Sequence, residues 1–169
     1  MKIGLDVDGV LANFNLAVSR FHNKPHITTN SWEQDWITEL FHTIEHDDEF
    51  WDELPVLSHP EEITFEFDYY ITAVPEHKKQ NRINWLKKNG FPDKPVIVSD
   101  EKLETMRELG VDVLIDDKYS TIKEVQEAGL IGIHFIPSYL EPKNTLTPNI
   151  KHLSQVNEIL VKYDRVPLI

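Results

Sequence analysis

The sequence predicts an α/β fold, a doubly wound parallel sheet with a small helical cap inserted after the first strand. Short runs of apolar and β-branched residues alternate with amphipathic stretches of about ten residues, the pattern of parallel strands joined by helices. Polar residues, mostly acidic, directly follow several of these runs. A segment from about residue 25 to residue 60 interrupts the alternation and is rich in acidic and aromatic residues.

The first part of the chain is predicted to hold one strand and three helices. Apolar residues at the N-terminus favour a buried strand, and three later stretches have apolar residues at helical spacing. Three of the four tryptophans lie here, and we expect most of these aromatics to form the core of the cap. The predicted ranges are 3–7 for the strand and 13–22, about 31–42 and 46–53 for the helices. Residues 13–60 would then form the cap, and residues 1–12 and 61–169 the core domain.

The rest of the chain alternates strands with helices. Asn89-Gly90 and Gly110 are typical of residues that end a helix. Each of these predicted helices except the last lies between two predicted strands, so each of those connections would be a βαβ crossover. The predicted strands are 67–75, 95–99, 111–115 and 131–136. The predicted helices are 76–89, 101–109, 119–128 and about 149–163, with a loop over 137–148.

Composition and charge exclude several kinds of protein. The chain has 169 residues, no cysteine and a formal net charge of -12. Disulfides, thiol catalysis and thiolate zinc sites are therefore excluded, and the charge argues against a broad nucleic-acid surface. No apolar run reaches the length of a membrane span and no signal-like segment begins the chain, so we expect a cytoplasmic protein without a membrane partner. A homodimer stays open, because the segment 164–169 would either pack on the chain or contact a second subunit.

Two carboxylates stand at the end of the first predicted strand. The side chains of Asp6 and Asp8 point the same way while the chain is extended, which brings their negative charges together. Such crowding is unfavourable unless a cation lies between the carboxylates or one of them stays protonated. Gly9 then lets the backbone turn sharply and leaves room for a ligand. A polar turn after an edge strand would explain one aspartate here but not two.

Further polar residues end two other predicted strands. Thr72 follows one of them, and Asp116 and Asp117 follow another. Each could merely cap the helix after it. Because the carboxyl ends of parallel strands meet at one edge of a sheet, four carboxylates and a hydroxyl would converge there, which favours a phosphate site with a hard cation.

The stretch Asp6-Val7-Asp8-Gly9-Val10-Leu11 resembles the first motif of the haloacid-dehalogenase-like phosphohydrolases. The resemblance implies that Asp6 is the nucleophile that attacks phosphorus and that Asp8 is the general acid and base. It further implies that Thr72 binds the phosphoryl group. Mg²⁺ would be held by Asp6, by the backbone carbonyl of Asp8, and by Asp116 or Asp117.

A basic residue should balance the nucleophile and the phosphate in such a site. Two residues are candidates: Lys102, just after a predicted strand, and Arg82, on the helix after Thr72. Each could equally belong to a solvated helix face, where most lysines and arginines lie. The sequence does not choose between them.

Within that superfamily the chain resembles most the 5'(3')-deoxyribonucleotidases and their bacterial and phage relatives. The likeness rests on the first motif, on Phe50-Trp51 with Leu54-Pro55, and on Leu114-Ile115-Asp116-Asp117. It implies a nucleoside monophosphate as substrate, with Phe50 and Trp51 as the wall that a nucleobase stacks on. Thr72 and Ala73 would contact the phosphate, although the family usually has serine where this chain has Ala73.

Three alternatives stay open at this point. The same chemistry could act on a sugar phosphate or on the 3'-phosphate of a polynucleotide. The chain could instead be a non-catalytic Mg²⁺-binding interaction domain, although the presence of both Asp6 and Asp8 argues against that. His42 and His46, four residues apart on a predicted helix, could begin a zinc site. No third ligand stands at a suitable spacing, so we interpret both as surface histidines.

Overall fold

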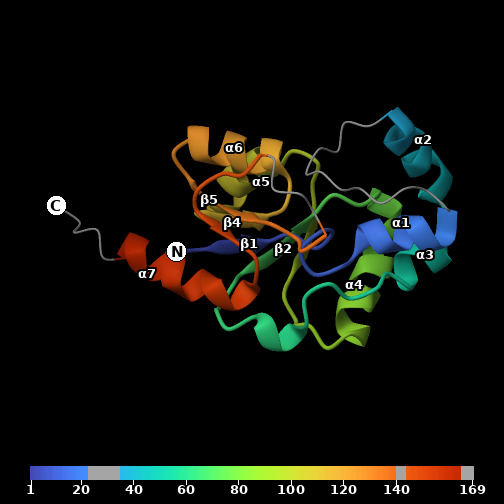
Figure 1. The fold of residues 1–169 in the computed structure, drawn as a ribbon, viewed down its shortest axis with the longest axis horizontal. Coiled ribbons are helices and arrows are strands. Elements are labelled where there is room, and N and C mark those ends of the chain that lie inside the picture. The colour runs from blue at the N-terminus through green and yellow to red at the C-terminus, as the bar shows by residue number, and fades with distance from the viewer. Residues whose placement is uncertain (23–34, 140–143, 165–169) are drawn as a thin grey trace.

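A parallel sheet lies at the centre of the computed structural model, which describes residues 1–22, 35–139 and 144–164 (Figure 1). Its strands are β1 (Ile3–Leu5), β2 (Tyr69–Thr72), β3 (Val96–Val98), β4 (Val113–Asp116), β5 (Ile131–Phe135) and β6 (Asn149–Ile150). They pair in the order β3-β2-β1-β4-β5-β6, and every pairing is parallel. The strand order reverses between β1 and β4, where doubly wound sheets bind their ligands. The predicted fold class is confirmed.

Helices cover both faces of the sheet. They are α1 (Phe14–His22), α2 (Asp35–Ile44), α3 (Asp48–Asp52), α4 (Lys79–Lys88), α5 (Lys102–Leu109), α6 (Tyr119–Glu127) and α7 (Val156–Asp164), with single 3₁₀ turns η1 (Pro60–Glu62), η2 (Glu76–Lys78) and η3 (Leu153–Gln155). In Figure 1, α5 and α6 lie together above the sheet and α7 lies below it. Helices α1, α2 and α3 gather with α4 beyond the carboxyl ends of the strands.

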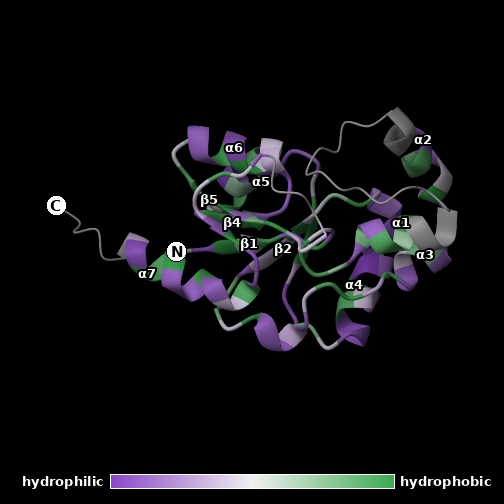
Figure 2. Ribbon diagram, in the orientation of Figure 1, coloured by the Kyte–Doolittle hydropathy of each residue, from purple (hydrophilic) through white to green (hydrophobic). Residues whose placement is uncertain are grey.

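The strands are apolar on both faces because both faces are buried (Figure 2). Along β4, Val113 and Ile115 belong to one apolar cluster and Leu114 to another. This alternation follows from the period of two in a strand. The first cluster includes residues of α1, α4 and α7. The second includes Met106 of α5 and Ile122 of α6.

The predicted helix ends are confirmed where glycine marks them. Gly110 follows α5 with a φ of 68° and is its left-handed C-cap. Asn89 is the C-cap of α4, and Gly90 after it has a φ of 79°. Glycine is favoured at both turns because a positive φ costs it no steric clash.

The predicted final helix, about 149–163, was wrong at its start. Asn149 and Ile150 form the edge strand β6, which pairs with His134 and Phe135 of β5. The helix α7 begins only at Val156, after the turn η3. The pairing is set by the free edge of β5, which a two-residue strand cannot reveal in its own sequence.

The region predicted as a cap contains α1, α2 and α3, although residues 31–34 of one predicted helix lie outside the described residues. The buried side chains of these helices join the same apolar cluster as the sheet; they include Phe14, Leu40, Ile44, Phe50 and Trp51. The division into core domain and cap stays a prediction. Among the described residues, no helix has the length and apolar character needed to cross a membrane.

Candidate active site

The loop after β1 is closed by its own hydrogen bonds. The carbonyl of Val7 accepts from the backbone N–H groups of Leu11 at 2.8 Å and Ala12 at 2.9 Å. Gly9 turns the chain with a φ of 82° and donates its N–H to the Ala12 carbonyl at 2.9 Å. A Cβ at Gly9 would lie 2.1 Å from a carboxylate oxygen of Asp117, so the loop packs directly against the end of β4.

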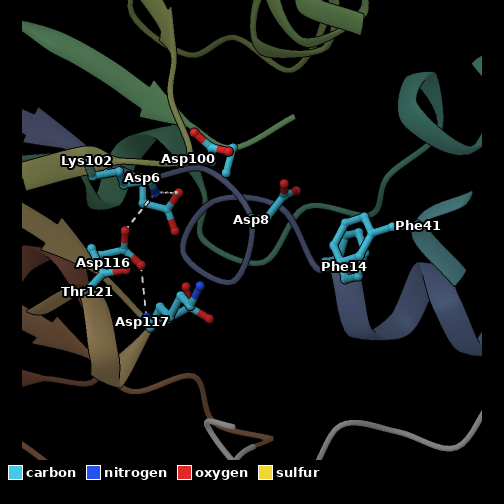
Figure 3. A pocket seen from close by; sticks show the side chains of 11 residues that line it. Asp6, Asp8, Phe14, Phe41, Asp100, Lys102, Asp116, Asp117 and Thr121 are labelled. Atoms are coloured by element: carbon cyan, nitrogen blue, oxygen red, sulfur yellow. Dashed lines mark hydrogen bonds and ion pairs between the residues drawn. The ribbon is translucent and has the colours of Figure 1, made fainter. Parts of the chain in front are cut away.

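Three buried carboxylates converge at the switch point of the sheet (Figure 3). Asp6 follows β1, Asp116 ends β4 and Asp117 comes next. One ligand oxygen from each lies within 4.8 Å of the others, and the three residues are 4 %, 1 % and 3 % exposed. The Asp6 N–H donates to the Ile115 carbonyl at 3.0 Å, which fixes the two strand ends side by side. We call Asp6, Asp116 and Asp117 the aspartate cluster.

Burial and mutual repulsion perturb the aspartate cluster. Burial first, and then the charge of Asp116, raise the pKa of Asp6 to about 7, against the attraction of Lys102. The pKa of Asp117 is also raised well above its usual range, by burial and then by the charges of Asp6 and Asp116. Lys102 therefore does not fully offset the burial and mutual repulsion of these carboxylates. The oxygen ligands of the cluster suit a hard divalent cation such as Mg²⁺, which would relieve the repulsion.

Lys102 is the basic residue at the aspartate cluster. It is the first residue of α5, and its Nζ lies 2.7 Å from one oxygen of Asp6 and 2.7 Å from one of Asp116. Burial alone would lower the pKa of Lys102, but the charges of Asp116 and Asp6 outweigh it and raise the pKa. Lys102 is therefore a permanent cation beside Asp6.

Arg82, the other basic candidate, contacts Asp8 instead. Its Nη2 donates to a carboxylate oxygen of Asp8 at 2.7 Å, and its side chain is 1 % exposed. The guanidinium lies over the Trp51 ring, 5.7 Å from the centroid. The other oxygen of Asp8 and the Nε and Nη1 of Arg82 are buried without a hydrogen-bond partner in the described part of the chain. The two basic candidates thus serve different carboxylates.

Thr72 ends β2 inside the protein. The residue is fully buried, and its Oγ1 has no hydrogen-bond partner among the described residues. Buried hydroxyls are normally satisfied, so this one points to a partner supplied by a ligand. Ala73, the next residue, lines the cavity at the site.

A cavity of about 280 Å³ adjoins the aspartate cluster, Asp8 and Lys102, whereas Thr72 and Arg82 do not line it. Its aromatic wall is made by Phe14 of α1 and Phe41 of α2, whose rings stack with centroids 5.8 Å apart and planes at 24° (Figure 3). The other lining residues are Asp6, Asp8, Ala73, Asp100, Lys102, Asp116, Asp117, Lys118 and Thr121. The cavity joins a charged floor to an apolar wall.

Phe50 and Trp51, predicted as that wall, lie behind it. Both are buried, at 0 % and 2 % exposure, and neither lines the cavity. The Trp51 Nε1–H donates to the Ile44 carbonyl at 2.9 Å, and Phe50 packs edge-on against Phe14 at 5.5 Å. Helix α3 turns both rings into the core, so they support Phe14 instead of facing a substrate.

Some residues at the site were missed by the sequence analysis. Asp100 stands just beyond β3, where the strand-end argument could have found it. Lys118 comes directly after the predicted acidic pair, and Thr121 lies one helical turn further on in α6. His134 of β5 donates from Nε2 to the Asp117 carbonyl at 3.0 Å and accepts at Nδ1 from the Leu146 N–H at 3.2 Å. Burial lowers the pKa of His134, which keeps it neutral in this bridge.

The fold is similar to that of two solved hydrolase structures. One is described as a dehalogenase, with a TM-score of 0.55 and 12 % identity over 94 % of this chain and 96 % of that one. The other is YfnB of Bacillus subtilis, described as a HAD-hydrolase bound to magnesium. Its TM-score is 0.54, and the two sequences are 17 % identical over 95 % of this chain and 98 % of that one. No family model and no curated protein matches the sequence. The haloacid-dehalogenase-like fold that the first motif implied is thus confirmed.

Proposed function

We propose that this protein is a Mg²⁺-dependent phosphomonoester hydrolase that works through an aspartyl-phosphate on Asp6. The observation that carries the proposal is the aspartate cluster at the switch point of the sheet, with Lys102 bonded to Asp6 and Asp116. A nucleophilic carboxylate, a cation and further metal-binding oxygens are the parts that phosphoryl transfer needs. They lie at the floor of a cavity open to a small ligand.

The metal would be held by Asp6, by Asp116 or Asp117, and by the backbone carbonyl of Asp8. The raised pKa values of Asp6 and Asp117 support this, because they arise from burial and then from repulsion between the carboxylates, both of which a bound cation would offset. When bound, Mg²⁺ supplies charge neutralisation for the phosphoryl oxygens. The structure of YfnB is described as bound to magnesium, which supports the choice of metal.

In the first step, one oxygen of Asp6 attacks phosphorus and the bond from phosphorus to the ester oxygen breaks. Asp8, in its protonated form, gives its proton to the departing oxygen. The Asp8 carboxylate pairs with Arg82 and its side chain is 16 % exposed, so it lies at the mouth of the cavity and not within the aspartate cluster. Arg82 stabilises the carboxylate form that Asp8 takes after it has given up its proton.

In the second step, Asp8 takes a proton from water as the water attacks the phosphorus of the intermediate. The bond between phosphorus and Asp6 breaks, inorganic phosphate leaves, and Asp8 is again protonated. Lys102 stays charged throughout and stabilises the equatorial oxygens. The Thr72 hydroxyl, unpaired in the described structure, would donate to one of them.

We further propose a nucleoside monophosphate, most readily a deoxyribonucleotide, as the substrate. The stacked rings of Phe14 and Phe41 offer an apolar wall for a base beside the charged floor. The cavity, at about 280 Å³, is at the small end of ligand sites, which favours a small ester over the end of a polynucleotide.

A panel of phosphomonoesters assayed with wild-type protein and with Phe41→Leu tests the substrate. Leucine keeps the apolar volume but removes the ring that would stack. We expect KM for deoxyribonucleoside monophosphates to rise about tenfold, since stacking is worth about 1–3 kcal/mol per base. KM for a sugar phosphate, the internal control, should stay unchanged. Turnover of sugar phosphates alone would refute the nucleotide and keep the catalytic proposal.

A further inference from the structure

A second group of metal-ligating side chains lies outside the candidate active site. Glu45 and His46 follow the end of α2, and His77 lies in η2, 31 residues further along the chain. One ligand atom from each lies within 4.8 Å of the others. The imidazole rings of His46 and His77 stack with centroids 4.9 Å apart and planes at 25°. None of the three residues lines the cavity beside the aspartate cluster.

The tautomer of His77 is fixed by a hydrogen bond. Its Nε2 lies 2.7 Å from the backbone carbonyl of Glu45, and a carbonyl only accepts, so Nε2 carries the proton. In the neutral ring Nδ1 then holds a lone pair for a ligand. Histidines that bind metals usually donate their second N–H to a carbonyl or a carboxylate in this way. The hydrogen bond therefore prepares His77 to bind a metal through Nδ1.

The donor atoms select a different ion from the one proposed for the aspartate cluster. Two imidazole nitrogens and one carboxylate oxygen suit Zn²⁺, Ni²⁺ or Cu²⁺, whereas Mg²⁺ prefers oxygen alone. In a tetrahedral zinc site with bonds of about 2.0 Å, neighbouring ligand atoms lie about 3.3 Å apart. The ligand atoms already lie within 4.8 Å of one another, so rotation of the Glu45 and exposed His46 side chains can bring them to this spacing while His77 keeps its hydrogen bond.

The backbone around this group is already held in place. Lys78, next to His77, pairs its Nζ with the carboxylate of Asp48 at 2.5 Å. The Asn81 side-chain amide donates to the same carboxylate at 3.1 Å. Asp48 opens α3, two residues after His46, so these contacts hold η2 and α4 against the loop between α2 and α3. A bound ion would need to order only side chains.

We propose that Glu45, His46 and His77 form a second metal site, for a divalent transition-metal ion of the Zn²⁺ class, that ties the end of α2 to η2. A water would complete the coordination, since three ligands come from the protein. The Glu45 N–H donates to the Phe41 carbonyl at 3.0 Å, one turn back along α2. The site would thereby hold the segment that carries the aromatic wall of the cavity. The proposal does not depend on the proposed reaction.

The site is tested by titrating the full chain with Zn²⁺ in the presence of millimolar Mg²⁺. Calorimetry and ¹H–¹⁵N spectra of the imidazoles report the binding. We expect one Zn²⁺ per chain and a large shift of the His77 Nδ1 resonance. His77→Gln should weaken this binding at least about tenfold, because losing a supporting partner of a ligand alone costs about 10–100-fold. Glutamine can still donate to the Glu45 carbonyl, so the variant should keep the fold and the wild-type circular dichroism.

His42→Gln is the matched control. His42 is an exposed histidine in α2, just before Glu45 and His46, and it lies outside the group of three ligands. The variant should bind Zn²⁺ as the wild type does. Absence of Zn²⁺ binding, equal binding by His77→Gln and wild type, or equal loss in His42→Gln would each overturn the proposal. Zn²⁺ taken up by the aspartate cluster would persist in every histidine variant and leave the His77 resonance unmoved, which also contradicts the assignment.

Discussion

At the scale of the residue, chemically identical carboxyl groups differ in burial and in the charges around them. Asp6 is buried with Asp116, Asp117 and Lys102, and its pKa is raised to about 7. Asp8, two residues on, is partly exposed and pairs with Arg82. Environment, not residue type, therefore distinguishes the residue that we propose as nucleophile from the one that we propose as proton carrier.

Removing the buried hydroxyl of Thr72 should lower activity without lowering stability. Thr72→Val keeps the shape of the side chain and removes an Oγ1 that has no partner in the described structure. We expect stability to stay the same or to rise by about 1 kcal/mol, because burying an unpaired hydroxyl is costly. We expect kcat/KM to fall about tenfold or more, since a charge-assisted hydrogen bond is worth about 1.5–3 kcal/mol. Urea unfolding and phosphate-release kinetics measure the two effects; a marked loss of stability with unchanged activity would contradict the assignment.

Single residues were predictable where a local rule placed them. Asp6, Asp116 and Asp117 each end or follow an apolar strand, and the parallel sheet brings the carboxyl ends of these strands together. Phe14 and Phe41 had no such signal, because the rotation of α1 and α2 about their axes decides which rings face the cavity. The choice between Lys102 and Arg82 likewise depended on tertiary contacts.

At the scale of the element, the loop after β1 is shaped by one glycine. Gly9 supplies a positive φ and also the space that the Asp117 carboxylate occupies. The turn of the loop and the packing of the aspartate cluster therefore both depend on Gly9. The helix and strand pattern of the chain was largely readable in the sequence, since buried strands and amphipathic helices leave clear periodicities. The short edge strand β6 was not, because its pairing depends on β5.

A pair of glycine variants isolates the steric part of this arrangement. Gly9 and Gly129 both have a φ of 82°, but nothing lies within 4 Å of a Cβ built at Gly129. Gly129→Ala should cost about 1–2 kcal/mol of unfolding free energy, the usual penalty for a left-handed residue with a side chain. Gly9→Ala should cost clearly more and should abolish turnover, because its Cβ would meet the Asp117 carboxylate at 2.1 Å. Equal losses in chemical denaturation would show that the clash is relieved without cost.

At the scale of the whole molecule, the sheet buries like charges at its own switch point. The chain carries a net charge of -12, and the most deeply buried carboxylates among the residues that the structure describes are those of the aspartate cluster. Such a centre opposes folding, and the proposed cation would relieve this, as expected where a site is shaped for function. Stability should therefore report on the metal.

Without metal, stability should fall as the pH rises from about 4 to 7. An unfolded Asp6 loses its proton near pH 4, whereas the folded one keeps it until about pH 7. The folded state therefore binds more protons in this range, which makes the slope of the unfolding free energy against pH negative. Thermal unfolding in EDTA should show the fall, and Mg²⁺ should raise Tm most near pH 7 and above.

Asp6→Asn should reduce this dependence and raise the metal-free Tm at pH 7.5, by about 2–4 °C for each kcal/mol of repulsion removed. Glu124→Gln removes one charge from the exposed side of α6, beyond its first turn, and should leave both the slope and Tm unchanged. The same slope in wild type and Asp6→Asn would mean that another group causes it.

In the proposed function, Asp6 is the nucleophile of a Mg²⁺-dependent phosphatase. The most direct test is phosphate release from a deoxyribonucleoside monophosphate, measured for wild type and Asp6→Asn with Mg²⁺ and with EDTA. We expect release by wild type with Mg²⁺, none above background with EDTA, and at least about a 10³-fold loss in a folded Asp6→Asn protein. Release by Asp6→Asn close to that of wild type, or release unaffected by EDTA, would contradict the proposal.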